Sequence, residues 1–107
     1  MNSSQKQKTA DLLSICFKAG KAVKGFDSSA DAVKNGSAFC VLLASDASDK
    51  TAKEADFVCG KYSIPVLRTE LAKADIARLC HKETAVIAVC DKGFAERFAV
   101  IVSEKHS

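Results

Sequence analysis

The chain has 107 residues, of which 48% are hydrophobic and 27% are charged, and this fits one globular domain better than two. No apolar run approaches the roughly 18–20 residues of a membrane helix, and no signal peptide is recognisable, so we expect a cytoplasmic protein without a membrane partner. The formal net charge is +3, and residues 1–24 carry five lysines against one aspartate. Such a basic region favours a polyanionic partner, although a solvated lysine-rich helix face is the commoner cause.

The five cysteines predict neither a disulfide framework nor a metal site. Their number is odd, no two form a Cys-x-x-Cys pair, and His81 and His106 are not spaced to complete a zinc site. Each cysteine lies among apolar residues, as free thiols in a core do. We therefore expect no metal and no other cofactor.

The first helix is predicted over about residues 5–19, and Gly20 follows at the position of a C-terminal stop. Its apolar stripe at helical spacing is Leu12, Ile15, Cys16 and Ala19. The next residues, KAVKG (21–25), predict a very short strand.

A second helix is expected to begin after Asp27, with Asp27 or Ser28 as its N-cap, and to end at Asn35-Gly36. Asn-Gly is also a hairpin signal. The helix stop is favoured because no alternating strand precedes it.

A continuous apolar run, Ala38–Ala44, predicts a central strand that is covered on both faces. Ser48 is expected to cap a helix over about 49–62. The segment SIPVLR (63–68) predicts a short strand, with Pro65 at its start or at a sheet edge.

Thr69 is expected to cap a fourth helix, Thr84–Cys90 predicts a second buried strand, and Asp91 is expected to cap the last helix. Helices and strands therefore alternate along the whole chain. This alternation predicts an α/β fold, a three-layer α-β-α sandwich with a four-stranded mixed sheet, as a single domain over residues 1–107.

Sequence motifs of common enzymes are missing. The segment KGFDSSAD lacks the Gly-Lys-Ser/Thr of a phosphate-binding loop, no GxGxxG follows a strand, and no GxSxG elbow occurs. His81 has no Ser or Cys partner by motif, and Asp46 and Asp49 lie where acids favour a helix N-terminus. We therefore expect that the protein is not an enzyme.

The turn Lys24–Ser28 is the candidate binding site. The helix N-terminus after it offers unpaired N–H groups and a partial positive charge, and Lys18, Lys21 and Lys24 are predicted to surround it. Phe26 could stack on a base or fold beneath the helix as a core anchor. The core role is slightly favoured.

Five segments carry a family resemblance: LLSICFKAGKAVKG, KGFDSSADAVKNG, VLLASDAS before a helix, YSIPVLR, and HKETAVIAVCDKGFA. Their order and spacing over about residues 9–102 resemble the kink-turn RNA-binding ribosomal protein family. That family includes the archaeal large-subunit protein seven-Ae and the eukaryotic thirty-e proteins, and the small bacterial YlxQ-like members look most similar. The resemblance implies an α-β-α sandwich that binds a sharply bent RNA, with residues 9–102 as its core.

In that family, a Gly-x-Asn-Glu run and a lysine three residues further on recognise the sheared G·A pairs of the RNA. This sequence matches the glycine at Gly25, but Asp27 and Ser28 stand at the asparagine and glutamate positions, and Asp31 stands at the lysine position. Ionised Asp only accepts hydrogen bonds, and Asp31 puts an anion where relatives face a phosphate. The resemblance therefore implies an altered or weak reader of such RNA.

A second loop of the family packs against a flipped base and corresponds to about Cys80–Ala85. Ala77 and His81 stand where relatives tend to have glycine. His81 and Lys82 can add a donor and a charge toward a phosphate, and Thr84 belongs to the same predicted contact surface.

Together these observations predict a small RNA-binding protein without catalysis. The lysines expected to contact phosphates are Lys18, Lys21, Lys24 and Lys34. Gly25 is expected to allow close approach, and Asp27 and Ser28 to meet a base edge. The expected partner is a structured, kink-turn-like RNA bound by a monomer, and association with the ribosome or a translation factor is left open. The alternative is a protein-interaction module that kept the fold and lost specific RNA binding.

Overall fold

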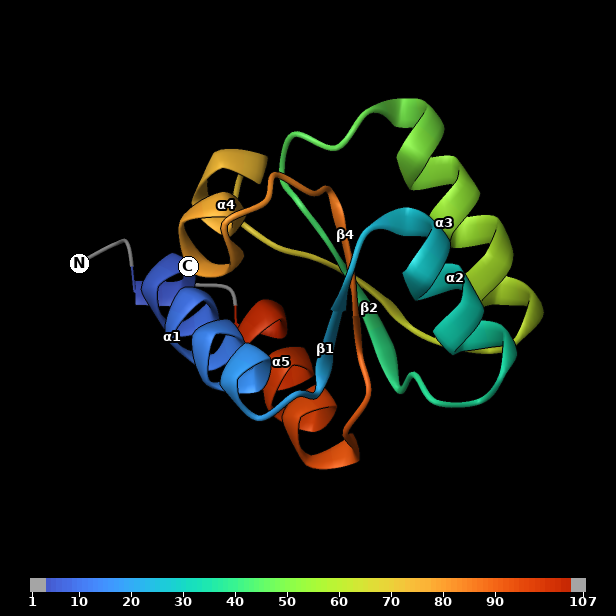
Figure 1. Cartoon of the computed structure of the whole chain (residues 1–107), viewed down its shortest axis with the longest axis horizontal. Coiled ribbons are helices and arrows are strands. Elements are labelled where there is room, and N and C mark those ends of the chain that lie inside the picture. Colours follow the sequence, from blue (N-terminus) through green and yellow to red (C-terminus); the bar gives the residue numbers. More distant parts are fainter. Residues whose placement is uncertain (1–3, 105–107) are drawn as a thin grey trace.

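The fold is a four-stranded mixed sheet with helices on both faces, as the sequence predicts (Figure 1). A computed structural model describes residues 4–104, so His106 lies outside the described part of the chain. The helices are α1 (Ser4–Lys18), α2 (Phe26–Lys34), α3 (Asp49–Lys61), α4 (Lys73–Cys80) and α5 (Lys92–Ser103). The strands are β1 (Ala22–Lys24), β2 (Cys40–Leu43), β3 (Val66–Arg68) and β4 (Val86–Val89).

The strand order β1-β4-β2-β3 places β2 and β4 at the centre and β3 at an edge. β4 runs antiparallel to both β1 and β2, whereas β2 and β3 are parallel. Both central strands are buried at every position, which explains their continuous apolar sequences. Pro65 directly precedes the edge strand β3, where a missing N–H is tolerated.

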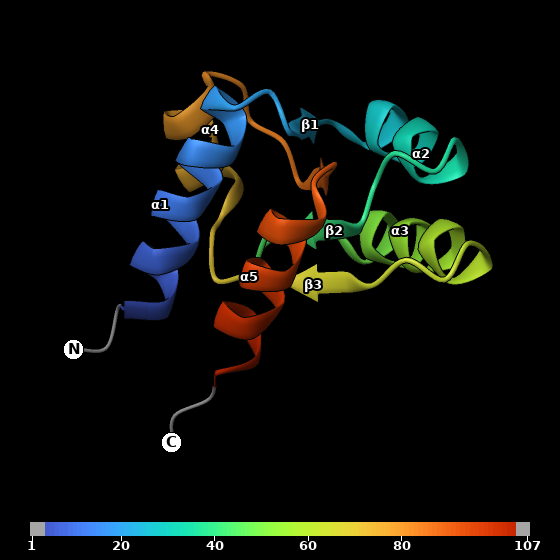
Figure 2. The same cartoon turned by 90° about the horizontal axis from the view of Figure 1, so that it is seen from below.

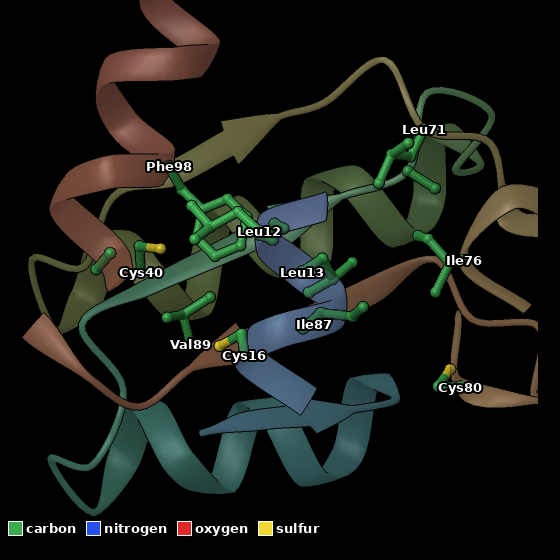
Figure 3. Close-up of a cluster of buried hydrophobic side chains, with 13 residues drawn as sticks. Leu12, Leu13, Cys16, Cys40, Leu71, Ile76, Cys80, Ile87, Val89 and Phe98 are labelled. Carbon is green, nitrogen blue, oxygen red and sulfur yellow. The ribbon is translucent and has the colours of Figure 1, made fainter. Parts of the chain in front are cut away.

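Alternate side chains of the central strands enter two hydrophobic cores on opposite faces of the sheet. Leu42 and Ile87 pack with α1, α4 and α5, whereas Val41 and Val86 pack with α2 and α3. Figure 2 shows α2 and α3 on one side of the strands and α1, α4 and α5 on the other. Figure 3 shows the first core, in which the fully buried Phe98 of α5 contributes the largest side chain. The sheet therefore separates α2 and α3 from the other three helices.

The buried face of α1 differs from the predicted stripe. Ile15 is 52% exposed and Ala19 lies at the surface, whereas Thr9 and Leu13 are buried. α1 packs against both α4 and α5, so its buried face is set by two neighbours. The Thr9 hydroxyl can be buried because it donates to the carbonyl oxygen of Gln5 at 2.8 Å.

Two predicted helix caps are confirmed. Ser48 Oγ accepts a hydrogen bond from the Thr51 N–H at 3.1 Å, and Asp91 Oδ2 accepts from the Phe94 N–H at 2.9 Å. The predicted end of the second helix is confirmed as well, because α2 stops before Asn35.

Two other predicted caps are wrong. Gly25 rather than Asp27 is the N-cap of α2, so Asp27 lies within the first turn, where its charge still complements the helix dipole. α4 begins at Lys73 instead of directly after Thr69. The Thr69 hydroxyl donates to the carbonyl oxygen of Leu43 at 2.9 Å and thereby ties the end of β3 to β2.

Candidate nucleic-acid interface

The two segments that the sequence singles out meet at one end of the sheet. The Gly25 N–H donates to the Val86 carbonyl oxygen at 2.9 Å, directly beyond the paired strands β1 and β4. Lys24 Nζ also donates to the Cys80 carbonyl oxygen at 3.2 Å, which ties the end of β1 to the end of α4. We call these two segments, 24–28 and 81–85, the loop edge; they lie in the upper part of Figure 1.

The start of α2 leaves its first-turn N–H groups without a side-chain cap. Gly25, the N-cap, adopts φ 98° and ψ 150°, a backbone conformation that favours glycine, and glycine has no side chain that could cap the helix. A Cβ at this position would meet nothing within 4 Å, so the conformation rather than crowding explains the glycine. The open surface above Gly25 also leaves room for a ligand to approach the backbone.

The exposed face of α2 is acidic at its start. Asp27, Ser28 and Asp31 are all exposed. Ser29 points the other way and is buried, and its hydroxyl donates to the Val23 carbonyl oxygen at 3.3 Å. The three positions that correspond to the family's RNA-recognition residues therefore all face solvent. Two of the three side chains, however, are carboxylates.

Phe26 lies partly buried beneath α2. It lines a small apolar cavity with Val33, Val41 and Cys59, and it packs against the core between α2, α3 and the sheet. This position matches the core-anchor interpretation of Phe26, because its ring packs against the core.

The predicted lysines do not gather around the loop edge. Lys21 precedes β1, and its carbonyl oxygen accepts from the Cys90 N–H, so Lys18 and Lys21 lie at the opposite end of this strand, about 10 Å away. Lys34 ends α2, about 12 Å from its start at 1.5 Å per residue. Lys24 is the predicted lysine that remains at the loop edge.

The second loop supplies a further cation. Lys82 is exposed, and His81, also exposed, ends α4 with a left-handed φ of 62°. That conformation favours glycine, the residue that the family resemblance leads us to expect at this position. Thr84 is buried, and its hydroxyl donates to the Val86 carbonyl oxygen at 3.1 Å, so its polar group is already satisfied within the protein.

Sequence reasoning missed a third segment at this end of the sheet, residues 45–48 between β2 and α3. The Ala44 N–H donates to the Ala85 carbonyl oxygen at 2.9 Å, which places the end of β2, where this segment begins, beside the second loop. The antiparallel pairing of β2 with β4 brings this segment to the same end of the sheet. A single sequence does not reveal that pairing.

The cysteines are free, and all but Cys90, which is half-buried, are buried. Burial raises the pKa of Cys16 to about 11 and that of Cys40 to about 12, so both stay protonated and unreactive near neutral pH. Within residues 4–104, no three Cys, His, Asp or Glu side chains form a group that could hold a metal ion. In the same range, no helix has the length and apolar character needed to span a membrane.

The family model described as ribosomal protein L7Ae/L30e/S12e/Gadd45 matches residues 7–99. The chain therefore belongs to the ribosomal protein L7Ae/L30e/S12e/Gadd45 family. RNA-binding protein YlxQ of Bacillus subtilis (strain 168) is 38% identical over 87 residues, or 80% of this chain and 86% of that protein. RNA-binding protein YlxQ of Enterococcus faecium is 29% identical over 97 residues, or 91% and 93% of the two chains. These matches confirm the resemblance that the sequence motifs carry.

Two solved structures share the architecture. A protein with unknown function from Bacillus halodurans C has a TM-score of 0.83 and 33% identity, covering 89% of this chain and 96% of that one. The Giardia lamblia 15.5kD RNA binding protein has a TM-score of 0.76 and 18% identity, covering 97% and 89%. The second likeness concerns the fold alone, and it confirms the predicted α/β class.

Proposed function

We propose that this protein binds structured RNA at the loop edge and has no catalytic role. The observation that carries the proposal is the junction of the α2 start with the second loop through Lys24 and Cys80. The junction supports a shared site for the uncapped N–H groups of α2 and the Lys82 ammonium of the second loop, a combination that suits phosphate oxygens. The RNA-binding relatives named above support the same partner class.

The RNA expected at this site is bent like a kink-turn, as in the family. The acids at the start of α2 weaken or alter its recognition, because Asp27 and Asp31 repel phosphates and cannot donate to a base. Binding is therefore expected to depend on Lys24, Lys82 and the backbone of Gly25 more than on α2 side chains. We expect a cytoplasmic monomer, and the ribosome is one source of such RNA.

The test is to titrate a labelled kink-turn RNA with the Lys82→Glu variant. Lys82 is exposed, so the substitution should change the free energy of unfolding by less than about 0.5 kcal/mol. Affinity at low salt should fall several-fold, and the slope of log affinity against log salt should drop by about 1. Lys92→Glu on α5 is the matched control and should bind as wild type. Equal binding by both variants would remove the loop edge from the RNA contact.

A protein-interaction module is the second candidate, and the exposed carboxylates of Asp27 and Asp31 favour it. This candidate predicts a partner with a basic surface and a complex that survives nuclease treatment. Loss of that complex in an Asp27→Asn, Asp31→Asn double variant, together with no RNA affinity in the wild type, would establish it.

A further inference from the structure

Phe57 on α3 belongs neither to the two hydrophobic cores nor to the loop edge. It is 75% exposed, more than any other large hydrophobic side chain within residues 4–104. The buried face of α3 is formed by Ala52, Ala55 and Cys59, so Phe57 projects from the opposite, outer face. Leaving a phenylalanine in water forfeits the free energy that its burial would provide, and a binding role would account for its position.

Lysines flank this ring along the same face of the helix. Lys53 lies four residues before Phe57, Lys61 four residues after it, and Lys50 seven residues before it. At 100° per residue, all three lysines fall within the same quarter of the helix circumference as Phe57. None of them makes an ion pair with another side chain of the described structure. We call Lys50, Lys53, Phe57 and Lys61 the α3 strip.

The acids of α3 reduce this positive charge only in part. Asp56 is paired with Arg68 of β3 at 3.2 Å, and Asp49 lies in the first turn, where its charge complements the helix dipole. Glu54 and Asp49 border the outer face, about 60° and 80° around the helix from Phe57. Three cations against two anions leave the α3 strip with a small positive excess, which is complementary to a polyanion.

The chemistry of the α3 strip fits a nucleotide better than a protein surface. A protein partner of an exposed helix usually needs several apolar anchors at helical spacing, whereas Phe57 is surrounded here by lysines. One aromatic ring with flanking ammonium groups is the arrangement that holds single-stranded RNA, because a base stacks on the ring and the phosphates meet the cations. Tyr62, just beyond α3, already has the Lys61 ammonium 6.0 Å from its ring centre.

The α3 strip begins at the same end of the sheet as the loop edge. Leu43, the last residue of β2, pairs with Val86, the first residue of β4, and α3 follows β2 after the short 45–48 connection. α2 and α3 then lie side by side on one face of the sheet (Figure 1). An RNA held at the loop edge can therefore continue along the outer face of α3.

We propose that the α3 strip binds a single-stranded segment that flanks the structured RNA, with one base stacked on Phe57. The inference rests on the proposed function at the loop edge and extends it to a second contact. It explains how a protein with acids at the start of α2 gains affinity, since the missing cations of α2 are replaced by lysines of its neighbour.

The experiment compares a kink-turn RNA with the same RNA carrying about six unpaired uridines on either end. Wild type should bind one of the extended RNAs about tenfold more tightly than the core RNA, a typical contribution of one stacked base. Phe57→Ala should lose this gain and bind the core RNA as wild type does. Val100→Ala, an exposed apolar truncation on α5, is the matched control and should keep the gain.

A second variant reports stacking directly. The chain has no tryptophan, so Phe57→Trp introduces a single one that can be excited selectively over Tyr62. The extended RNA should quench its fluorescence, whereas the core RNA should not. A gain that persists in Phe57→Ala, or no gain in the wild type, would overturn the inference. Self-association of wild type that Phe57→Ala abolishes would also overturn it, because the ring would then contact a second copy.

The two proposals fail in different ways. If the core RNA does not bind but free oligouridine binds wild type and not Phe57→Ala, the loop-edge proposal fails and the α3 strip stands. If the core RNA binds through Lys82 and the uridines add nothing, the loop edge stands and the α3 strip is wrong.

Discussion

Asp31 stands one helical turn after Asp27 on the exposed face of α2, at the position where relatives are expected to carry a lysine. Replacing it with lysine removes a repulsion and adds a phosphate contact, so Asp31→Lys should raise RNA affinity several-fold at low salt and steepen the salt dependence by about 1. The measurement is a titration at several salt concentrations. Glu96→Lys on α5 makes the same charge change far from the loop edge, and an equal gain there would show a non-specific effect.

His81, at the end of α4, has an unfavourable backbone conformation. Its φ of 62° is left-handed, which disfavours a side chain by roughly 1 kcal/mol or more relative to glycine. His81→Gly should therefore raise the free energy of unfolding by about 1 kcal/mol in urea denaturation. Ala77→Gly, within the same helix, should lower it by about 1 kcal/mol. A destabilised His81→Gly variant would mean that the imidazole makes a contact worth more than the strain.

At the scale of elements, α4 depends on an acid near its start. Asp75 Oδ2 accepts from the Ala72 N–H at 2.9 Å, and Lys6 of α1 and Arg78 lie 3.3 Å and 2.9 Å from its carboxylate oxygens. The backbone hydrogen bond, followed by these cations, lowers the pKa of Asp75 below its ordinary value of 3.8. The same carboxylate thus caps α4 and ties it to α1.

This shift predicts a pH dependence. Because the folded pKa of Asp75 is below the unfolded one, its charge stabilises the fold above about pH 4, and this contribution is lost as the pH falls through the folded pKa. The stability difference between wild type and Asp75→Asn should therefore be largest at pH 7 and shrink toward pH 3 in urea denaturation. The stability difference between wild type and the control variant Glu96→Gln should change little with pH. A pH-independent difference for Asp75→Asn would exclude the ionic contribution.

The element boundaries show where sequence reasoning succeeds. Ser48 and Asp91 are caps in the structure because their side-chain oxygens accept from N–H groups in the first turn of the helix that follows each of them. Thr69 has the same chemistry, but its hydroxyl is taken by the Leu43 carbonyl oxygen, a contact between strands that local sequence does not reveal. Asp27 was misplaced because acids are favourable both at an N-cap and in the first turn.

At the scale of the whole molecule, the alternation of apolar runs and helical stripes was enough to predict the fold class. The position of the cations was not predictable in the same way. Lys21 and Lys24 are three residues apart in sequence, but Lys21 precedes β1 and Lys24 is its last residue, so the two lysines lie at opposite ends of the strand. Strand direction and order also bring the end of β2, and with it the 45–48 connection to α3, to the loop edge. Both depend on long-range pairing that one sequence does not specify.

The most direct test of RNA recognition at the loop edge is fluorescence anisotropy of a labelled kink-turn RNA, titrated with the wild-type protein at 50 and 200 mM salt beside a straight duplex of equal length. We predict binding that is stronger for the kink-turn RNA than for the duplex at both salt concentrations and that weakens as salt rises, because backbone N–H groups and a few lysines hold a bent phosphate backbone. Equal affinity for the two RNAs, or no binding at 50 mM salt, would contradict the proposed function.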